Sequence, residues 1–226
     1  MPHPLIFLAS ASPRRAQILE TVGLPFVVAA SDAVEPPPDE ADERAPQEFV
    51  ERLARLKAQG CDLEKMRALH NFPNTGKILV LAADTIVWHE GKILSKPHNE
   101  ADATRMLQRL RGQTHTVFTG VCLRVVEPEY CRTEQYSPAE QYSCAHEATR
   151  VQFGEAGDAW IEKYVASGEP MDKAGAYAAQ GRGAILIERI EGDFWNVVGL
   201  PIARVARMLK GAGAPVEMWW EESSEF

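Results

Sequence analysis

The chain contains 226 residues (25.0 kDa), and 24 basic against 32 acidic side chains give it a formal net charge of −8. This length is typical of one domain, which we expect to span residues 1–226. A surface this negative repels nucleic acid polymers and anionic membranes, so neither is expected as a partner. Hydrophobic residues at 45% and charged residues at 25% exclude disorder as the dominant state.

Cysteine spacing and hydropathy indicate a cytoplasmic protein. The cysteines form no C-x-x-C pair, so we expect reduced thiols rather than a zinc site or a disulfide framework: Cys61, Cys122, Cys131 and Cys144. No apolar run approaches the roughly 18 residues of a membrane helix. The run at residues 5–8 precedes Ala9-Ser10-Ala11, but no Lys or Arg comes before it, which favours a buried strand over a signal peptide.

The first half of the chain alternates between strand and helix patterns. Strands are predicted at 5–9, 26–30 and 77–83, helices at 13–22 and 47–59, and a hairpin pairs 85–88 with 92–94. Ser12 and Pro13 are typical of a helix start, and Gly23 of a helix end. The acidic, Pro-rich segment 31–46 is expected to be an exposed loop, and 61–76 a connector.

The second half is predicted to continue as a meander. A helix at 99–110 and a strand at 116–126 lead to a surface excursion at 127–143, and then to a strand at 143–153. A helix from Asp158 ends at Gly168, a glycine-rich loop covers 168–183, strands follow at 184–190 and 194–198, and a last helix starts at Pro201. The tail 218–226 is expected to fray or to pack against a partner. The order of elements predicts an α/β fold with a mixed sheet.

Arg14 and Arg15 occupy the opening turn of the first helix, where cations oppose the helix dipole at about 0.3–1 kcal/mol each. Together with free backbone N–H groups and the hydroxyls of Ser10 and Ser12, they would form an anion site. The alternative is a pair of solvated arginines. Lys57 shares part of the apolar face of its helix, so it either extends its amine to the rim or reaches into a cleft.

Asp84 follows the most hydrophobic predicted strand, where α/β sheets place catalytic and binding groups. A carboxylate beside core residues is costly to ionise unless a metal, a cation or a substrate pairs with it, although a turn or cap residue is the alternative. Lys96 precedes Pro97 and therefore projects from extended backbone.

Four cationic side chains and one hydroxyl form a possible binding set for a small polyanion with three or four charges in this acidic protein. They are Arg14, Arg15, Lys57, Lys96 and the hydroxyl of Ser10. Asp84, and Glu35 in the acidic loop, could hold a divalent metal beside that polyanion. The combination indicates phosphate-ester or phosphoanhydride chemistry, without a P-loop motif and without H-E-x-x-H.

Five ordered motifs resemble the Maf family over residues 5–209. They are Leu8-Ala9-Ser10-Ala11-Ser12-Pro13-Arg14-Arg15, Ala83-Asp84-Thr85-Ile86-Val87, Lys96-Pro97, residues 172–181 (DKAGAYAAQG) and Val197-Val198-Gly199-Leu200-Pro201. Maf proteins were first named as septum-formation inhibitors and are nucleoside triphosphate pyrophosphatases. The resemblance implies an inosine-triphosphatase-like fold, with a mixed twisted sheet flanked by helices and a central cleft. It also implies a homodimer.

The resemblance further implies cleavage between the α- and β-phosphates with Mg²⁺ or Mn²⁺ as cofactor. Asp84 would be the general base or a metal-side carboxylate, and Glu35 would help to hold the metal, with Asp32 or Glu40 as alternatives. The triphosphate would be gripped by Ser10, Arg15, Lys57 and Lys96, the two lysines acting beside Asp84 in catalysis.

Base discrimination is implied for Arg14, Thr85 and Gln180, a pattern of the family branch that acts on dTTP and UTP. Gln180 carries an amide donor and an acceptor that suit the edge of a pyrimidine. A branch preferring 7-methyl-GTP has an aromatic residue at the position of Arg14 and an acidic one in place of Gln180. We therefore expect an enzyme that clears dTTP, UTP or modified relatives from the nucleotide pool. The alternatives are a purine or 7-methyl-GTP preference, and a nucleotide-binding regulator of cell division.

Overall fold

The computed structural model describes residues 3–70, 77–127 and 141–220 of the chain. Its centre is a seven-stranded sheet in the order β2-β1-β3-β5-β6-β7, and β4 pairs with β3 outside that order. The strands are β1 Leu5–Leu8, β2 Phe26–Val28, β3 Ile78–His89, β4 Lys92–Leu94, β5 Thr114–Val126, β6 Gln141–Phe153 and β7 Ile187–Glu191. β1 is parallel to β2 and β3, whereas the pairs β3–β4, β3–β5, β5–β6 and β6–β7 are antiparallel.

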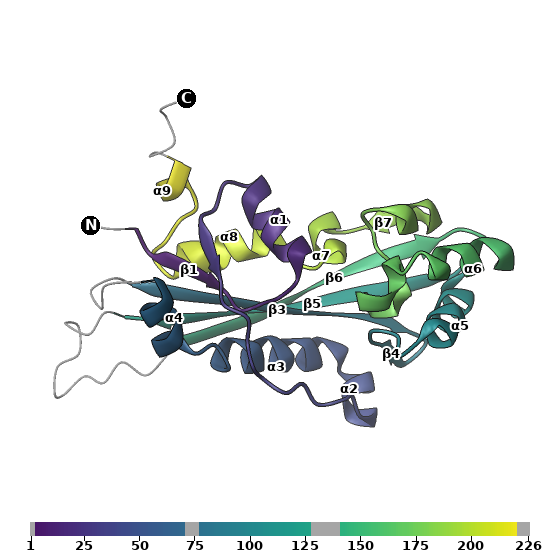
Figure 1. Ribbon diagram of the computed structural model, residues 1–226, viewed down its shortest axis with the longest axis horizontal. Helices are drawn as coiled ribbons and strands as arrows, with labels where there is room; N and C mark the ends of the chain where they lie inside the picture. The colour runs from purple at the N-terminus through teal and green to yellow at the C-terminus, as the bar shows by residue number, and fades with distance from the viewer. Residues whose placement is uncertain (1–2, 71–76, 128–140, 221–226) are drawn as a thin grey trace.

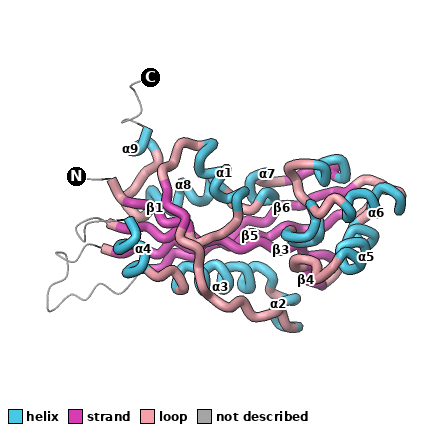
Figure 2. Tube along the Cα trace, in the orientation of Figure 1, coloured by secondary structure: helices cyan, strands magenta, loops and turns pink. Residues whose placement is uncertain are grey.

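Helices flank this sheet on both faces (Figures 1 and 2), which confirms the predicted α/β fold with a mixed sheet. They are α1 Pro13–Thr21, α2 Glu40–Arg44, α3 Pro46–Gln59, α4 Leu63–His70, α5 Glu100–Leu110, α6 Asp158–Ala166, α7 Phe194–Val198, α8 Ile202–Gly211 and α9 Glu217–Trp220. α3 covers one face of the sheet, and α1, α7 and α8 cover the other. α5 and α6 pack together at the far end of the long strands.

Strict alternation along β3 assigns its side chains to these two layers, because successive residues of a strand point to opposite faces. Leu79, Leu81 and Ala83 pack in the cluster that includes α1 and α8. Ile78, Val80 and Ala82 pack in the cluster that includes α3. The same alternation directs Asp84 toward α3 and Thr85 toward α1.

Asp84 does not follow a strand end as the sequence suggested, because β3 runs on through it to His89. It is β1 that ends: Leu8 pairs with Leu81, and β1 does not continue past this point. The edge of β3 beyond Leu81 is therefore free of its parallel neighbour, and this opens a cleft beside Asp84. The hairpin predicted between residues 85–88 and 92–94 is confirmed as β3–β4.

Two segments predicted as loop or connector contain helices. Asp39 begins α2 through a capping box, in which its side chain accepts hydrogen bonds from Ala41 N and Asp42 N, while Asp39 N donates one to the Asp42 carboxylate. Asp62 accepts a hydrogen bond from Lys65 N at 3.0 Å in the first turn of α4. These carboxylates stabilise helix starts in a composition that otherwise favours loops.

The two strands predicted after the glycine-rich loop are only partly correct. Residues 182–186 form a 3₁₀ turn, so β7 is limited to Ile187–Glu191. Residues 194–198 are helical, because Asp193 accepts a cap hydrogen bond from Trp195 N at 2.8 Å and Gly199 ends the turn with a φ of 122°. The β-favouring composition of Phe-Trp-Asn-Val-Val is thus outweighed by its caps.

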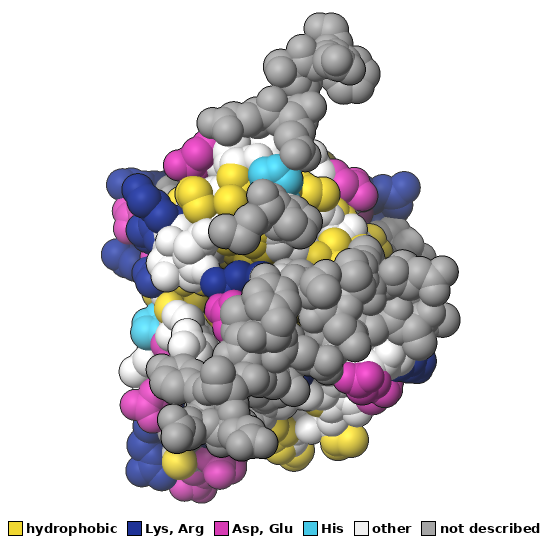
Figure 3. Space-filling model, turned by 90° about the vertical axis from the view of Figure 1, so that its left-hand side faces the viewer, with side chains coloured by type: hydrophobic (Ala, Val, Ile, Leu, Met, Phe, Trp, Pro, Cys, Tyr) yellow, Lys and Arg dark blue, Asp and Glu magenta, His cyan; other side chains and the backbone are white. Residues whose placement is uncertain are grey.

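The tail prediction is wrong for residues 218–220. Trp219 is buried in the cluster beneath α1 and α8, and Trp220 Nε1 donates a hydrogen bond to Val22 O at 2.9 Å. Residues 221–226, and most of the predicted excursion at 127–143, lie outside the described residues. In the described ranges, no helix has the length and hydropathy needed to span a bilayer. Acidic and basic side chains are interspersed with apolar ones on the face seen in Figure 3.

Candidate active site

A cavity of about 380 Å³ lies where β1 ends, between the start of α1, α3, β3 and the segment 172–180. It is lined by the nine side chains that the family resemblance implies for catalysis, substrate binding or metal binding: Ser10, Arg14, Arg15, Glu35, Lys57, Asp84, Thr85, Lys96 and Gln180. Asp32 and Glu40, the alternatives to Glu35, do not line this cavity. The roles assigned to these residues remain predictions, but their convergence on one cleft is a property of the fold.

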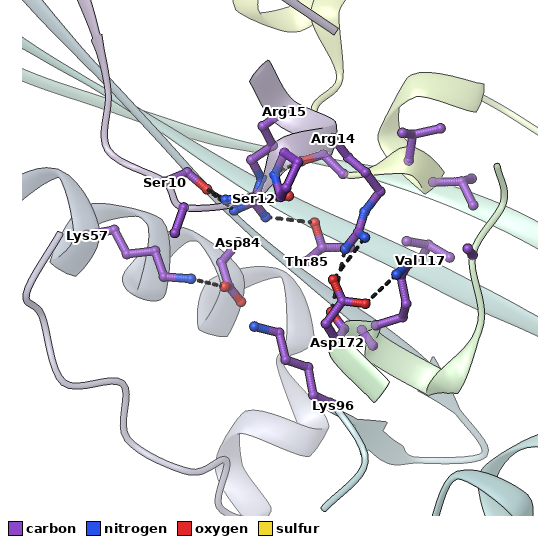
Figure 4. A pocket seen from close by; sticks show the side chains of 18 of the residues that line it. Ser10, Ser12, Arg14, Arg15, Lys57, Asp84, Thr85, Lys96, Val117 and Asp172 are labelled. Carbon is purple, nitrogen blue, oxygen red and sulfur yellow. Dashed lines mark hydrogen bonds and ion pairs between the residues drawn. The ribbon is translucent and has the colours of Figure 1, made fainter. Parts of the chain in front are cut away.

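Asp84 is the buried carboxylate of the cavity, with 8% of the residue exposed. It forms an ion pair with Lys57 Nζ, and Lys57 also contacts Glu35 Oε1 at 3.1 Å. Burial raises the pKa of Asp84, although the charges of Lys57 and Arg15 oppose the shift. Figure 4 shows Lys57 reaching this carboxylate from α3, while Lys96 points toward it from the other side.

Arg15 is fixed by three hydrogen bonds on the opposite side of β3. Its Nε donates to Gly199 O at 2.9 Å. Its Nη1 donates to Ser10 Oγ at 2.9 Å and its Nη2 to Thr85 Oγ1 at 3.3 Å (Figure 4). Burial lowers the pKa of Arg15, and the negative charge of Asp84 opposes the shift. Ser10 Oγ also accepts a hydrogen bond from Ser12 N at 3.2 Å, so its own proton is available to the cavity.

The start of α1 has the predicted form but not the predicted cap. Ser12 occupies the N-cap position and Pro13 the first helical position, yet the Ser12 side chain makes no capping hydrogen bond. Anions are favoured at such a turn because its backbone N–H groups point outward.

Arg14 crosses the mouth of the cavity to the 172–180 segment. Its Nη1 donates to Asp172 Oδ2 at 3.1 Å, and Lys173 Nζ contacts the other carboxylate oxygen. Partial burial opposes ionisation of Asp172, but Lys173 and Arg14 lower the pKa of this carboxyl overall. Asp172 and Lys173 belong to the motif at residues 172–181 but had no predicted role, because no local pattern reveals a contact across 158 residues.

Three 3₁₀ turns build the segment that carries Gln180: Glu169–Asp172, Ala174–Ala176 and Arg182–Leu186. The Glu169 carboxylate accepts hydrogen bonds from two backbone N–H groups of the last turn, at 3.1 and 3.0 Å, and from the Tyr164 hydroxyl at 2.9 Å. Tyr164 in turn accepts one from Ala178 N at 3.1 Å. The backbone is thereby held on both sides of Gln180.

Glu35 and Asp84 are chemically suited to Mg²⁺, which proteins hold through one or two carboxylates while substrate phosphates and waters complete the octahedron. Both carboxylates contact Lys57, so they lie close enough to share a cation. Among the described residues, no group of three or more His, Cys, Asp or Glu side chains could form a metal site without a substrate. The two carboxylates fit a divalent cation whose other ligands are phosphate oxygens and water.

A buried hydroxyl network behind Thr85 was not anticipated from the sequence. Thr85 Oγ1 lies 3.0 Å from Thr119 Oγ1, and Thr119 donates to Asn196 O at 3.0 Å. Asn196 Nδ2 donates to Val117 O and to Thr149 Oγ1, each at 3.0 Å. Thr119 and Asn196 are both fully buried, so this network is shielded from solvent.

Comparisons with known proteins agree on one family. A family model described as Maf-like protein matches residues 5–212. A dTTP/UTP pyrophosphatase of Symbiobacterium thermophilum is 44% identical over 93% of this chain and 95% of its own length, and one of Dictyoglomus thermophilum is 38% identical over 92% and 96%. Among solved structures, the Staphylococcus aureus Ham1 protein matches 92% of this chain and 99% of its own length at 14% identity, with a TM-score of 0.40.

Proposed function

This chain belongs to the Maf family, and we propose that it is a nucleoside triphosphate pyrophosphatase that converts dTTP and UTP to the monophosphate and pyrophosphate. The observation that carries the proposal is one cavity in which a buried carboxylate lies among five cationic side chains: Arg14, Arg15, Lys57, Lys96 and Lys173. In a chain of net charge −8, this concentration of positive charge is matched to a small polyanion.

The triphosphate binds against the start of α1. Ser10 donates its hydroxyl proton, and the N–H groups of Arg15 that the protein leaves free add charge-assisted hydrogen bonds. Lys57 and Lys96 approach from the other side and neutralise charge that develops on the leaving pyrophosphate. Because Arg15 is already fixed by protein oxygens, little ordering remains to be done when the substrate binds.

Asp84 acts as the general base. It takes a proton from a water molecule whose oxygen attacks the α-phosphorus, and the bond from that phosphorus to the bridging oxygen of the β-phosphate breaks as pyrophosphate leaves. Burial raises the pKa of Asp84, which makes its carboxylate a stronger base, while the charge of Lys57 opposes the shift and favours the ionised form.

Glu35 and Asp84 would hold the divalent cation, Mg²⁺ or Mn²⁺. When bound, such an ion would neutralise phosphate charge and orient the triphosphate. Arg14, Thr85 and Gln180 would discriminate the base, Gln180 through its amide donor and acceptor. We also infer a cytoplasmic homodimer with nucleoside triphosphate as its partner, without a nucleic acid polymer or membrane partner.

The test is pyrophosphate release from dTTP, UTP, CTP, GTP and 7-methyl-GTP with Mg²⁺, using wild type and Asp84→Asn side by side. In water enriched in ¹⁸O, attack at the α-phosphorus places the label in the monophosphate, whereas attack at the β-phosphorus places it in pyrophosphate. We expect turnover of dTTP and UTP, label in the monophosphate, and loss of turnover in the variant.

Other outcomes would redirect the assignment. Selective hydrolysis of 7-methyl-GTP or GTP would retain the pyrophosphatase but overturn the roles of Arg14, Thr85 and Gln180. Tight nucleotide binding without turnover of any substrate would favour the nucleotide-binding regulator.

A further inference from the structure

We propose that Thr119 is a positioning residue that fixes the Thr85 hydroxyl as a hydrogen-bond acceptor, and that this selects a base edge with an N–H donor. The inference rests on the proposed function, in which Thr85 faces the base. It assigns a cause to the preference for uracil and thymine over cytosine.

The direction of each hydrogen bond follows from the chemistry of the groups. Asn196 O is a carbonyl and can only accept, so the single proton of Thr119 is directed to it at 3.0 Å. Thr119 Oγ1 must then accept from Thr85 Oγ1, which lies 3.0 Å away. Full burial of Thr119 and Asn196 prevents water from replacing either partner.

Thr85 is consequently left without a proton for the cavity. Its only hydrogen is donated to Thr119, and one of its two lone pairs accepts from Arg15 Nη2 at 3.3 Å. Arginine has no acceptor, so this second bond cannot reverse either. The remaining lone pair of Thr85 Oγ1 is what the hydroxyl can present to a ligand in the cavity that it lines.

This fixed polarity discriminates between pyrimidines. Uracil and thymine carry a hydrogen on N3 and can donate it, whereas neutral cytosine has a bare N3 lone pair. Two acceptors that face each other in the cavity leave both lone pairs without a hydrogen-bond donor, which is the kind of mismatch that enzymes reject strongly. A hydroxyl free to rotate would accept from uracil or donate to cytosine and would discriminate poorly.

The network also explains why Asn196, directly before the Val197–Pro201 motif, is buried. Its amide nitrogen donates to Val117 O and Thr149 Oγ1, and this fixes the turn of α7 whose carbonyl receives the Thr119 proton. The chain of bonds therefore runs from the far strand β6 through α7 and β5 to Thr85 on β3.

The experiment compares kcat/KM for UTP and CTP in wild type, Thr119→Val and Thr119→Ser. The two nucleotides share ribose and triphosphate, so a loss of folding or of phosphate binding lowers both values equally, whereas the UTP/CTP ratio isolates base selection. We expect Thr119→Val to lower this ratio about tenfold or more, and Thr119→Ser to restore it to within about threefold of wild type. Thr116→Val, on the same strand, is the control and should leave the ratio unchanged.

Thr119→Cys has a weaker donor of similar volume and should give an intermediate ratio, which keeps the test available if Thr119→Val does not fold. Thr85→Val is measured in parallel. If Thr119→Val leaves the UTP/CTP ratio unchanged, or lowers kcat/KM equally on both nucleotides, the inference is overturned. A lower ratio in Thr85→Val would then show that Thr85 selects the base without help from Thr119. If wild type hydrolyses neither UTP nor dTTP, the proposed function itself has failed.

Discussion

Replacing Gly120 with alanine should separate α3 from the sheet and impair both stability and catalysis. Gly120 pairs with Asp84 across β3 and β5. A Cβ at this position would lie 2.2 Å from Val50 O and 2.7 Å from Glu51 N on α3. Because these are backbone atoms, no rotamer change can relieve the overlap.

An ordinary contact begins at 3.4 Å, so α3 and β5 must move apart by about 1.2 Å. Overpacking of this kind costs about 1–3 kcal/mol, which lowers the melting temperature by about 2–12 °C in a chain of this size. Lys57 lies two turns beyond Val50 on the same helix and would move away from Asp84. Displacement of a reacting group by about 1 Å costs on the order of 100-fold in kcat/KM.

Calorimetry and UTP hydrolysis measure the two effects separately. Gly211→Ala is the matched control, because a Cβ there meets nothing within 4 Å, and its melting temperature should be unchanged or slightly raised. If Gly120→Ala melts within about 1 °C of wild type, the close approach of α3 is refuted. If the variant loses stability but retains kcat/KM, the reasoning that catalysis depends on the position of Lys57 on α3 is refuted.

Three further predictions concern charge and packing. Lys57→Met removes a cation that lowers the pKa of Asp84, so the acidic limb of a pH–kcat/KM profile should move to higher pH; an unmoved limb would exclude Asp84 as the titrating base. Burial and the charge of His89 lower the pKa of His115 to about 3, so its contribution to stability is full above about pH 6.5 and is lost as pH falls. Urea titrations of wild type and His115→Gln should therefore differ by about 2 kcal/mol in their change between pH 6.5 and 4.5, and parallel curves would contradict this. Trp219→Ala, which removes a buried side chain, should lower the free energy of unfolding by about 3–5 kcal/mol in the same assay. Trp220→Phe, which removes one hydrogen bond, should lower it by about 0.5–1.5 kcal/mol, and the reverse order would contradict the packing of α9.

Residues whose environment is set by local periodicity were predictable from the sequence. The helical spacing of Val50, Leu53 and Lys57 placed the lysine on the inner face, and it lies there beside Asp84. The dipole argument for the Arg14–Arg15 turn likewise identified a wall of the cavity. These signals are local because they depend on neighbours within two helical turns.

What the sequence could not reveal depends on lengths and pairings of distant segments. Asp84 was predicted to follow the end of its own strand. That strand, β3, continues to His89, and the strand that ends beside Asp84 is β1, more than seventy residues earlier in the chain. Nothing local relates Arg14 to Asp172, or Thr119 to Asn196, and in each case the partner is supplied by tertiary packing. The helix α7, which was predicted as a strand, shows that the caps at Asp193 and Gly199 can outweigh five residues of strand-favouring composition.

The continuity of the long strands has a mechanical consequence. β3 and β5 remain paired from Ile78 and Val126 to Trp88 and Thr116, and this ribbon passes through the apolar clusters on either side of the cleft. A hinge motion between the two sides of the cleft would have to bend the paired strands β3 and β5 and stretch the hydrogen bonds between them. We therefore expect adaptation to a ligand to come from side-chain rotations around the cleft, and not from a rotation of one side of the sheet against the other.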